Sequence, residues 1–137
     1  MKIALVVSDF NCEVTALMLE RARAHAALLG AEVSHVVHAP GVFDMGLLVK
    51  RLLTRSDVEG VVVLGAVIKG ETKHDEVIMA VAAKVAAELA LQFDKPVALG
   101  VSGPGMDRMQ ALDRIDNAKN AVESVVRLIK TLKGLTG

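Results

Sequence analysis

The sequence predicts an α/β three-layer sandwich, built in the flavodoxin-like manner around a four-stranded parallel sheet with strand order 2-1-3-4. Three observations carry this prediction. Four apolar runs of strand length alternate with helical segments, the connections between them are short, and the first and third runs are almost continuously apolar. Right-handed crossovers then place those two runs at the centre of the sheet. All 137 residues are expected to form one domain.

The first half of the chain supplies two strands and two helices. Residues 2–7 form an apolar strand, and a helix over residues 13–29 ends before Gly30. Residues 31–37 are mixed enough in polarity to be an edge strand, and a short helix follows at residues 43–53. These elements make two successive β-then-α units, as a parallel sheet requires.

The second half repeats the pattern with more apolar elements. Residues 58–66 form the most apolar strand, and residues 72–93 form a long alanine-rich helix with Thr72 and Asp75 at capping-box spacing. Residues 96–101 form the last strand. Ser102-Gly-Pro-Gly105 is expected to break the chain before a single final helix that runs to about residue 133.

Composition excludes several classes of protein. Sixteen basic and sixteen acidic residues cancel, so no overall field attracts nucleic acid or an acidic membrane, and any anion site must be local. The single cysteine, Cys12, excludes an internal disulfide and suits a reducing compartment. The apolar start of the chain is too brief for a signal peptide or a membrane span. A cytoplasmic location is therefore expected.

Several common catalytic and cofactor sites are not expected either. The chain has no Gly-x-Gly-x-x-Gly after the first strand, no phosphate-binding P-loop and no Gly-x-Ser-x-Gly elbow. A phospho-receiver would need an acidic residue after the third strand as well as Asp9 after the first, and Ala66-Val-Ile68 stands there instead. His25, His35 and His38 lack metal-ligand spacing, so no metal site is predicted from them.

Ligands of open parallel sheets bind at the carboxyl ends of the strands, where the strand order reverses. In the predicted order that point lies between the first and third strands. The loops that emerge on this edge cover residues 8–11, 38–44, 67–72 and 102–105. We therefore expect a small-molecule site to be built from these four loops.

The connection after the third strand is the most informative of the four. Gly70 permits a tight turn, and the free N–H groups around Glu71 and Thr72, at the start of a helix, form a site suited to phosphate. His74 follows in the first helical turn, where the positive end of the helix disfavours the charged imidazole and keeps it available as a base. The plainer interpretation is a strand-to-helix connection with a surface histidine.

Two other loops carry candidate ligand contacts. Phe10 lies in a polar loop, where it can stack on a planar heterocycle or simply cover the end of the sheet. Asp44 can accept hydrogen bonds from sugar-like hydroxyl groups or cap the second helix. Both interpretations stay open from the residues alone.

Two basic residues of the predicted last helix, Arg114 and Lys119, are candidate anion ligands that lie about one and a half turns apart. The residues alone favour a plainer role for them. On a solvated helix face they would pair with the nearby carboxylates of Asp113 or Asp116.

These loops resemble those of the 6,7-dimethyl-8-ribityllumazine synthase family. The motifs are Asp9-Phe-Asn11, Pro40-Gly-Val-Phe-Asp44, Gly65-Ala-Val-Ile-Lys-Gly-Glu-Thr-Lys-His74 and Gly100-Val-Ser-Gly-Pro-Gly-Met106, followed by Gln110, Arg114 and Lys119. The match spans essentially the whole chain, in the family's order and spacing. The last motif and the three residues that follow it are similar to those of the shorter archaeal-type members. The resemblance implies condensation of 5-amino-6-ribitylamino-uracil with 3,4-dihydroxy-2-butanone 4-phosphate, with loss of phosphate and water and without a metal or redox cofactor.

The resemblance also implies a role for each candidate residue. His74 would transfer protons, Phe10 would stack on the pyrimidine, and residues 70–72 would hold the phosphate together with Arg114 of the partner subunit. The uracil and the ribityl chain would contact Val42, Phe43, Asp44, Ala66, Val67, Ile68, Leu99 and Lys119. Asp44 stands where the family commonly has glutamate, and Leu99 stands where it often has phenylalanine.

A homo-oligomer is expected, because the resemblance implies five-membered rings or closed icosahedral shells of such rings. Residues 77–91 support self-association independently, since this helix is apolar nearly all round and carries only Lys84 and Glu88 as charges. Riboflavin synthase is a candidate partner by the same resemblance. The expected ligands are small-molecule substrates, and neither nucleic acid nor a membrane is expected as a partner.

Three other functions stay open at this level. A flavin- or mononucleotide-binding module would share the fold and bind without turnover. An archaeal riboflavin synthase would act on two lumazine molecules and need no phosphate site, which the turn at residues 70–72 and Arg114 argue against. A structural shell protein is the third alternative.

Overall fold

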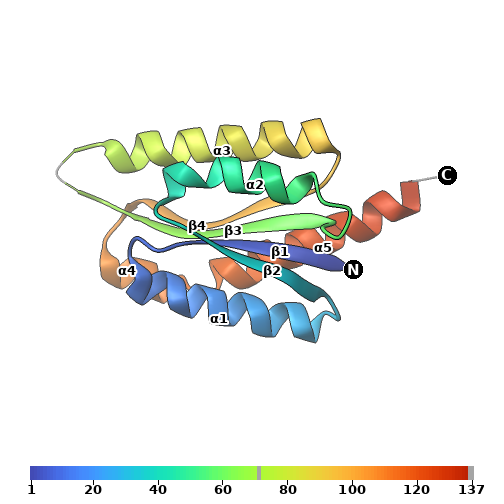
Figure 1. Cartoon of the computed structure of the whole chain (residues 1–137). Helices are drawn as coiled ribbons and strands as arrows, with labels where there is room; N and C mark the ends of the chain where they lie inside the picture. Colours follow the sequence, from blue (N-terminus) through green and yellow to red (C-terminus); the bar gives the residue numbers. More distant parts are fainter. Residues whose placement is uncertain (71, 136–137) are drawn as a thin grey trace.

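Four parallel strands form one sheet in the order β2-β1-β3-β4 in the computed structural model, which describes residues 1–70 and 72–135 (Figure 1). The strands are β1 (Lys2–Ser8), β2 (Glu32–Ala39), β3 (Gly60–Ile68) and β4 (Val97–Met106). Every paired neighbour runs parallel. The α/β class and the strand order predicted from the sequence are confirmed.

Helices cover both faces of this sheet (Figure 1). One face packs against α1 (Cys12–Leu28) and α5 (Asn117–Leu135), and the other packs against α2 (Met45–Leu53) and α3 (His74–Phe93). The short η1 (Val42–Asp44) leads into α2, and α4 (Arg108–Asp113) precedes α5.

The central strands explain why the core has two halves. Along β1, Ile3, Leu5 and Val7 face α1 and α5, whereas Ala4 and Val6 face α2 and α3. All five side chains are buried because β1 lies between β2 and β3 with helices on both faces. This arrangement fixes the carboxyl ends of β1 and β3 as neighbours at one edge of the sheet.

The predicted chain break at residues 102–105 is wrong, because β4 continues through it to Met106. Between the pairs Ala66–Ser102 and Ile68–Met106, β4 has two more residues than β3, so the extra chain bulges out and pairing then resumes. The Lys69 N–H donates to the Met106 carbonyl at 2.7 Å. Glycine and proline residues that indicate a break in a sequence can equally form such a bulge.

The predicted single final helix is also wrong. Asp107 and Gln110 form a capping box that starts α4, which ends at Asp113 with Arg114 as its C-cap, and α5 starts at Asn117. The Asn117 N–H donates to the Arg114 carbonyl at 3.0 Å across the turn between the two helices. No glycine or proline marks this turn, so periodicity alone could not locate it.

The start of α3 differs from the sequence prediction as well. The N-cap is Lys73, without a side-chain capping bond, so the predicted capping box of Thr72 and Asp75 is wrong. Asp75 instead accepts a hydrogen bond from the Gly105 N–H on β4, at 2.8 Å. The Asp75 carboxylate therefore forms a tertiary hydrogen bond with β4 in place of the local capping bond.

Candidate functional site

A cavity of about 420 Å³ opens at the carboxyl ends of β1 and β3. Its wall comes from the β1–α1 loop, the β2–η1 connection, the end of β3 and the first turns of α3. Ten of the predicted site residues line it: Phe10, Val42, Phe43, Asp44, Ala66, Val67, Ile68, Gly70, Thr72 and His74. The fold thus brings together residues that lie up to 64 positions apart in the chain.

Backbone and side-chain hydrogen bonds hold the β1–α1 loop in place. The N–H groups of Asp9 and Phe10 donate to the carbonyls of Ala39 and Pro40 at 2.8 and 3.0 Å. The Asn11 side chain donates to the Ala66 carbonyl at 2.9 Å. The loop is therefore fixed to both strands that flank β1, although Phe10 itself extends outward.

Two aromatic rings stand at the mouth of the cavity. Phe10 is 70% exposed and Phe43 is 64% exposed, although both belong to the wall. A single exposed phenylalanine is ordinary, but two at the mouth of one cavity form an apolar surface that a ligand or another chain can cover. Such rings provide flat apolar faces for a planar heterocycle.

The side of the cavity beside α3 is suited to an anion. Gly70 and Thr72 are exposed and line the cavity next to His74, the first residue of α3. The free N–H groups of the first helical turn are the positive end of the helix dipole. The predicted phosphate ligand Glu71 lies outside the described residues.

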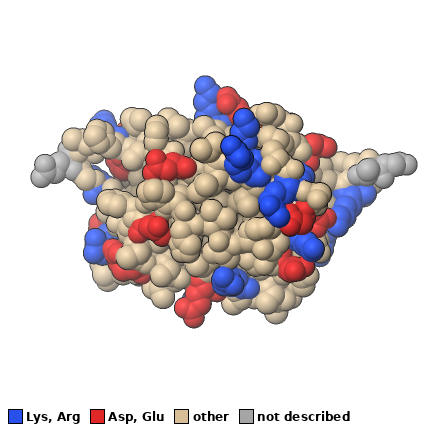
Figure 2. Space-filling model, in the orientation of Figure 1, with Lys and Arg blue, Asp and Glu red and all other residues tan. Residues whose placement is uncertain are grey.

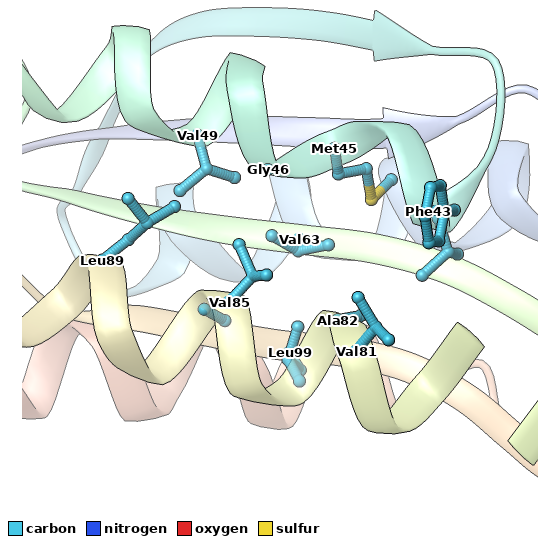
Figure 3. A pocket seen from close by; sticks show the side chains of 12 residues that line it. Phe43, Met45, Gly46, Val49, Val63, Val81, Ala82, Val85, Leu89 and Leu99 are labelled. Carbon is cyan, nitrogen blue, oxygen red and sulfur yellow. The ribbon is translucent and has the colours of Figure 1, made fainter. Parts of the chain in front are cut away.

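Three predicted site residues do not line this cavity. Leu99 lines a second cavity of about 50 Å³ between α2, α3 and the sheet, which shares Val42 and Phe43 with the first (Figure 3). Arg114 and Lys119 are exposed at the end of α4 and on α5. Within one chain, therefore, only part of the predicted set is brought together.

The second cavity is apolar, and two helices approach each other closely beside it. In Figure 3, Met45 and Val49 of α2 and Val85 and Leu89 of α3 surround it. A Cβ atom at Gly46 would lie 2.9 Å from Val85 Cγ1, so any larger residue there would force Val85 or one of the helices to shift. This cavity carries no polar side chain and is a packing feature of the α2–α3 layer.

The plainer interpretation of Arg114 and Lys119, in which each pairs with Asp113 or Asp116 on the helix surface, is not observed. Asp116 pairs with Arg21 of α1. Among the residues that the structure describes, neither Arg114 nor Lys119 has an ion-pair partner. Both side chains are thus available for an anion or another chain.

Charge is otherwise evenly distributed. On the face drawn in Figure 2, acidic and basic side chains are interspersed around an uncharged centre, in keeping with the zero net charge.

The clearly shifted carboxylate Asp57 lies away from the cavity. At the amino end of β3, two hydrogen bonds from the Arg55 guanidinium, at 2.8 and 3.0 Å, lower the pKa of Asp57. Within the described part of the chain, no three His, Cys, Asp or Glu side chains form a group able to hold a metal ion.

Five lining residues were not predicted from the sequence. They are Ser8, Asn11, Gly41, Asp75 and Ile78. Asn11 lies within the loop motif after the first strand, and asparagine at the end of a strand is a signal for a turn, so it could have been included. In the structure Asn11 has left-handed backbone angles (φ 62°, ψ 44°). Asp75 gave no such signal, because its partner Gly105 is thirty residues away on β4.

In the described ranges, no helix has the length and apolar character needed to cross a membrane.

Comparison with known proteins gives the same family as the loop motifs. The sequence model of the 6,7-dimethyl-8-ribityllumazine synthase family matches residues 1–133. Proteins named 6,7-dimethyl-8-ribityllumazine synthase from Metallosphaera sedula and Picrophilus torridus are 54% and 53% identical to this chain over 114 residues. These alignments cover 83% of this chain and 76% and 84% of the two relatives.

A protein of the same name from Methanothermobacter thermautotrophicus is 50% identical over 114 residues, which are 83% of this chain and 82% of that relative. The family match covers nearly the whole chain, and three of the four loop motifs line the cavity. The fourth, residues 100–106, does not line it and contacts its wall through the hydrogen bond from the Gly105 N–H to Asp75, so the expectation that residues 102–105 help to form the wall is wrong. The resemblance predicted from those motifs is confirmed. The chain belongs to the 6,7-dimethyl-8-ribityllumazine synthase family of transferases.

Proposed function

We propose that this protein condenses 5-amino-6-ribitylamino-uracil with 3,4-dihydroxy-2-butanone 4-phosphate to give 6,7-dimethyl-8-ribityllumazine, phosphate and water. One observation carries the proposal. A single cavity combines exposed aromatic rings with a helix N-terminus that suits an anion and begins with His74. A planar uracil and a phosphate ester need these two kinds of surface side by side.

The proposed reaction starts with attack of the uracil's primary amine on the butanone carbonyl, which forms an imine and releases water. Proton abstraction from the carbon chain then expels inorganic phosphate and leaves an enol, which becomes a ketone. The ribityl-bearing nitrogen attacks that ketone, and loss of a second water closes the ring. Holding the two substrates together supplies much of the rate enhancement.

The residues of this chain have separate parts in the proposal. Phe10 and Phe43 cover the heterocycle, and Asp44 accepts hydrogen bonds from the ribityl hydroxyl groups. His74 moves the protons, since it is exposed at the cavity wall. Backbone groups of Ala66, Val67 and Ile68 contact the edge of the uracil.

The phosphate site is completed by a second copy of the chain. Gly70, Glu71 and Thr72 contribute N–H groups, and Arg114 of the partner subunit supplies the guanidinium. The unpaired state of Arg114 among the described residues and its place outside its own cavity support this assignment. Lys119 is also exposed outside the cavity of its own chain, and we place it at the same subunit boundary. Leu99 packs inside its own chain between the sheet and α3, next to Val42 and Phe43.

The single free cysteine supports a cytoplasmic location for the enzyme. The reaction itself is tested by incubating the protein with both substrates while recording lumazine fluorescence and inorganic phosphate. Equal amounts of both products are expected. Tight binding of lumazine without turnover would instead identify a binding module, and conversion of lumazine alone to riboflavin would identify a riboflavin synthase.

A further inference from the structure

Asp75 is a buried carboxylate in the wall of the cavity, beside His74. Only 7% of the residue is exposed, and it lines the cavity from the first turn of α3. Its Oδ2 accepts a hydrogen bond from the Gly105 N–H at 2.8 Å. A buried carboxylate is costly unless hydrogen bonds compensate it, so this contact is a specific feature of the site.

The hydrogen bond joins α3 to a segment that is already attached to β3. The Lys69 N–H donates to the Met106 carbonyl at 2.7 Å, one residue from Gly105. Gly103 adopts φ +114°, and any Cβ atom there would collide with the Val67 carbonyl oxygen. The bulged part of β4 is thus packed directly against the end of β3.

Together these contacts anchor both ends of the connection between β3 and α3. Lys69, at the end of β3, is held by Met106, and Asp75, at the start of α3, is held by Gly105. The two anchor points are adjacent residues of β4. The position of His74 relative to the end of β3 therefore depends on β4 as well as on the connection itself.

We propose that Asp75 is a positioning residue, whose hydrogen bond from Gly105 holds the first turn of α3, and with it His74, against the cavity. This inference rests on the proposed function of His74. The acceptor oxygen carries the effect, because the contact is a hydrogen bond to a backbone N–H.

Asp75→Ala and Asp75→Asn separate the acceptor from the charge. Asp75→Ala is expected to lower kcat roughly 10- to 100-fold, which is the loss that a displacement of a catalytic group by about 1 Å can cause. Asp75→Asn keeps a side-chain oxygen that can accept from Gly105, so it should retain kcat within about threefold of the parent. An Asn variant as impaired as the Ala variant would overturn the proposal.

Glu76→Ala is the matched control. Glu76 is also an acidic residue of the first turn of α3, but its side chain is exposed and has no partner among the residues described. This variant removes the same charge from the same turn and is expected to keep the parental kcat. If Asp75→Ala also kept it, the positioning role would be refuted.

A double-mutant cycle shows whether Asp75 acts through His74. Adding Asp75→Ala to His74→Ala should cause little further loss of kcat, because there is no imidazole left to position. If the loss of kcat in the double variant equalled the product of the losses in the two single variants, the proposal would be contradicted. Hydrogen exchange of peptides covering residues 103–107 gives a readout independent of activity, and Asp75→Ala alone should accelerate it. Failure of the parent protein to form lumazine would refute the proposed function. Unchanged exchange in Asp75→Ala would refute the claim that the Asp75–Gly105 hydrogen bond holds α3 against β4.

Discussion

The side-chain amide of Asn11 donates a 2.9 Å hydrogen bond to the backbone carbonyl of Ala66, which lies 55 residues further along the chain. The same Asn11 has left-handed backbone angles (φ 62°, ψ 44°) at the N-cap of α1. One residue therefore turns the chain at the end of β1 and attaches that turn to the end of β3. Both functions suit asparagine, whose short amide side chain tolerates this conformation.

Asn11→Gly and Asn11→Ala should differ in stability. Either change removes the hydrogen bond to Ala66, at a cost of about 1 kcal/mol. Alanine must also adopt the left-handed conformation, which costs about 1–2 kcal/mol more than for glycine. The melting temperature is therefore expected to fall in the order parent, Asn11→Gly, Asn11→Ala. An alanine variant as stable as the glycine variant would show that the turn is not strained.

His74→Ala is expected to lower kcat at saturating substrate by roughly 10²- to 10⁴-fold without abolishing activity. Positioning of two substrates remains when the imidazole is removed, and it accounts for the residual rate. His35→Ala is the control, because His35 lies on β2 outside the cavity. Steady-state rates across a pH series measure the effect, and an unchanged kcat at every pH would exclude His74 from proton transfer.

Arg114→Lys should weaken binding of the butanone phosphate much more than binding of the ribityl uracil. A planar guanidinium can hold two phosphate oxygens at once, which an ammonium group does not reproduce. Separate KM values for the two substrates measure this difference. Equal losses for both would argue against a phosphate contact.

Mixing two inactive chains tests whether Arg114 and His74 meet across a subunit boundary. In mixed oligomers of Arg114→Ala and His74→Ala chains, some boundaries combine an intact arginine with an intact histidine. Partial recovery of activity is expected after refolding the two together. No recovery in oligomers proven to be mixed would place both residues in one chain's site.

Glu59 should make stability depend on pH in the acidic range. Burial raises the pKa of Glu59, but hydrogen bonds from the Lys2 N–H at 2.6 Å and from the Lys133 ammonium at 3.0 Å outweigh it, so the pKa lies below its ordinary value of 4.5. A lowered pKa in the folded state means that the stabilisation is present above that ordinary value. It is lost as the pH falls through the folded pKa.

Glu59→Gln is therefore expected to lower the melting temperature at neutral pH and to differ little from the parent at about pH 3. Glu32→Gln is the control, because Glu32 is exposed and its side chain has no partner within the described ranges. Thermal melts of the three proteins at both pH values give the answer. A constant difference between Glu59→Gln and the parent at all pH values would contradict the argument.

The amino-acid sequence was sufficient to predict the strand order and three of the four loops expected at the site, for a physical reason. Strand topology alone decides which loops share an edge of a parallel sheet, so the order of the strands is enough to group Phe10, Asp44 and His74. The contacts of Asp75 depend instead on how β4 bulges at Gly103. That bulge is a tertiary arrangement, and a run of glycine and proline does not distinguish it from a break.

The helical part of the site was less predictable. The turn after Arg114 places this residue at a helix end, and the residues around it give no local signal for that turn. Arg114 and Lys119 also lie outside the cavity of their own chain. Their role depends on which surfaces meet in an oligomer, and neither hydrophobic periodicity nor a single chain specifies that.

We expect the protein to form at least a pentamer. Only three of the twenty residues of α3 are buried in the single chain: Asp75, Ala86 and Leu89. Val77 is 59% exposed on this helix, Phe43 of η1 is 64% exposed, and Leu47 of α2 is 65% exposed. A largely apolar helix with so little cover, next to other exposed apolar side chains, indicates a surface that another chain buries.

A head-to-tail contact at this surface closes a ring when the rotation between neighbours permits it. Val77→Glu should therefore dissociate the oligomer and remove activity, since a charge would be buried in the contact and the partner's Arg114 would be lost from the cavity. Leu28→Glu is the control, because Leu28 is 78% exposed on α1, across the sheet from α3. Light scattering measures the result: a parent monomer with full activity would refute the ring, and a particle of roughly sixty chains would identify a closed shell.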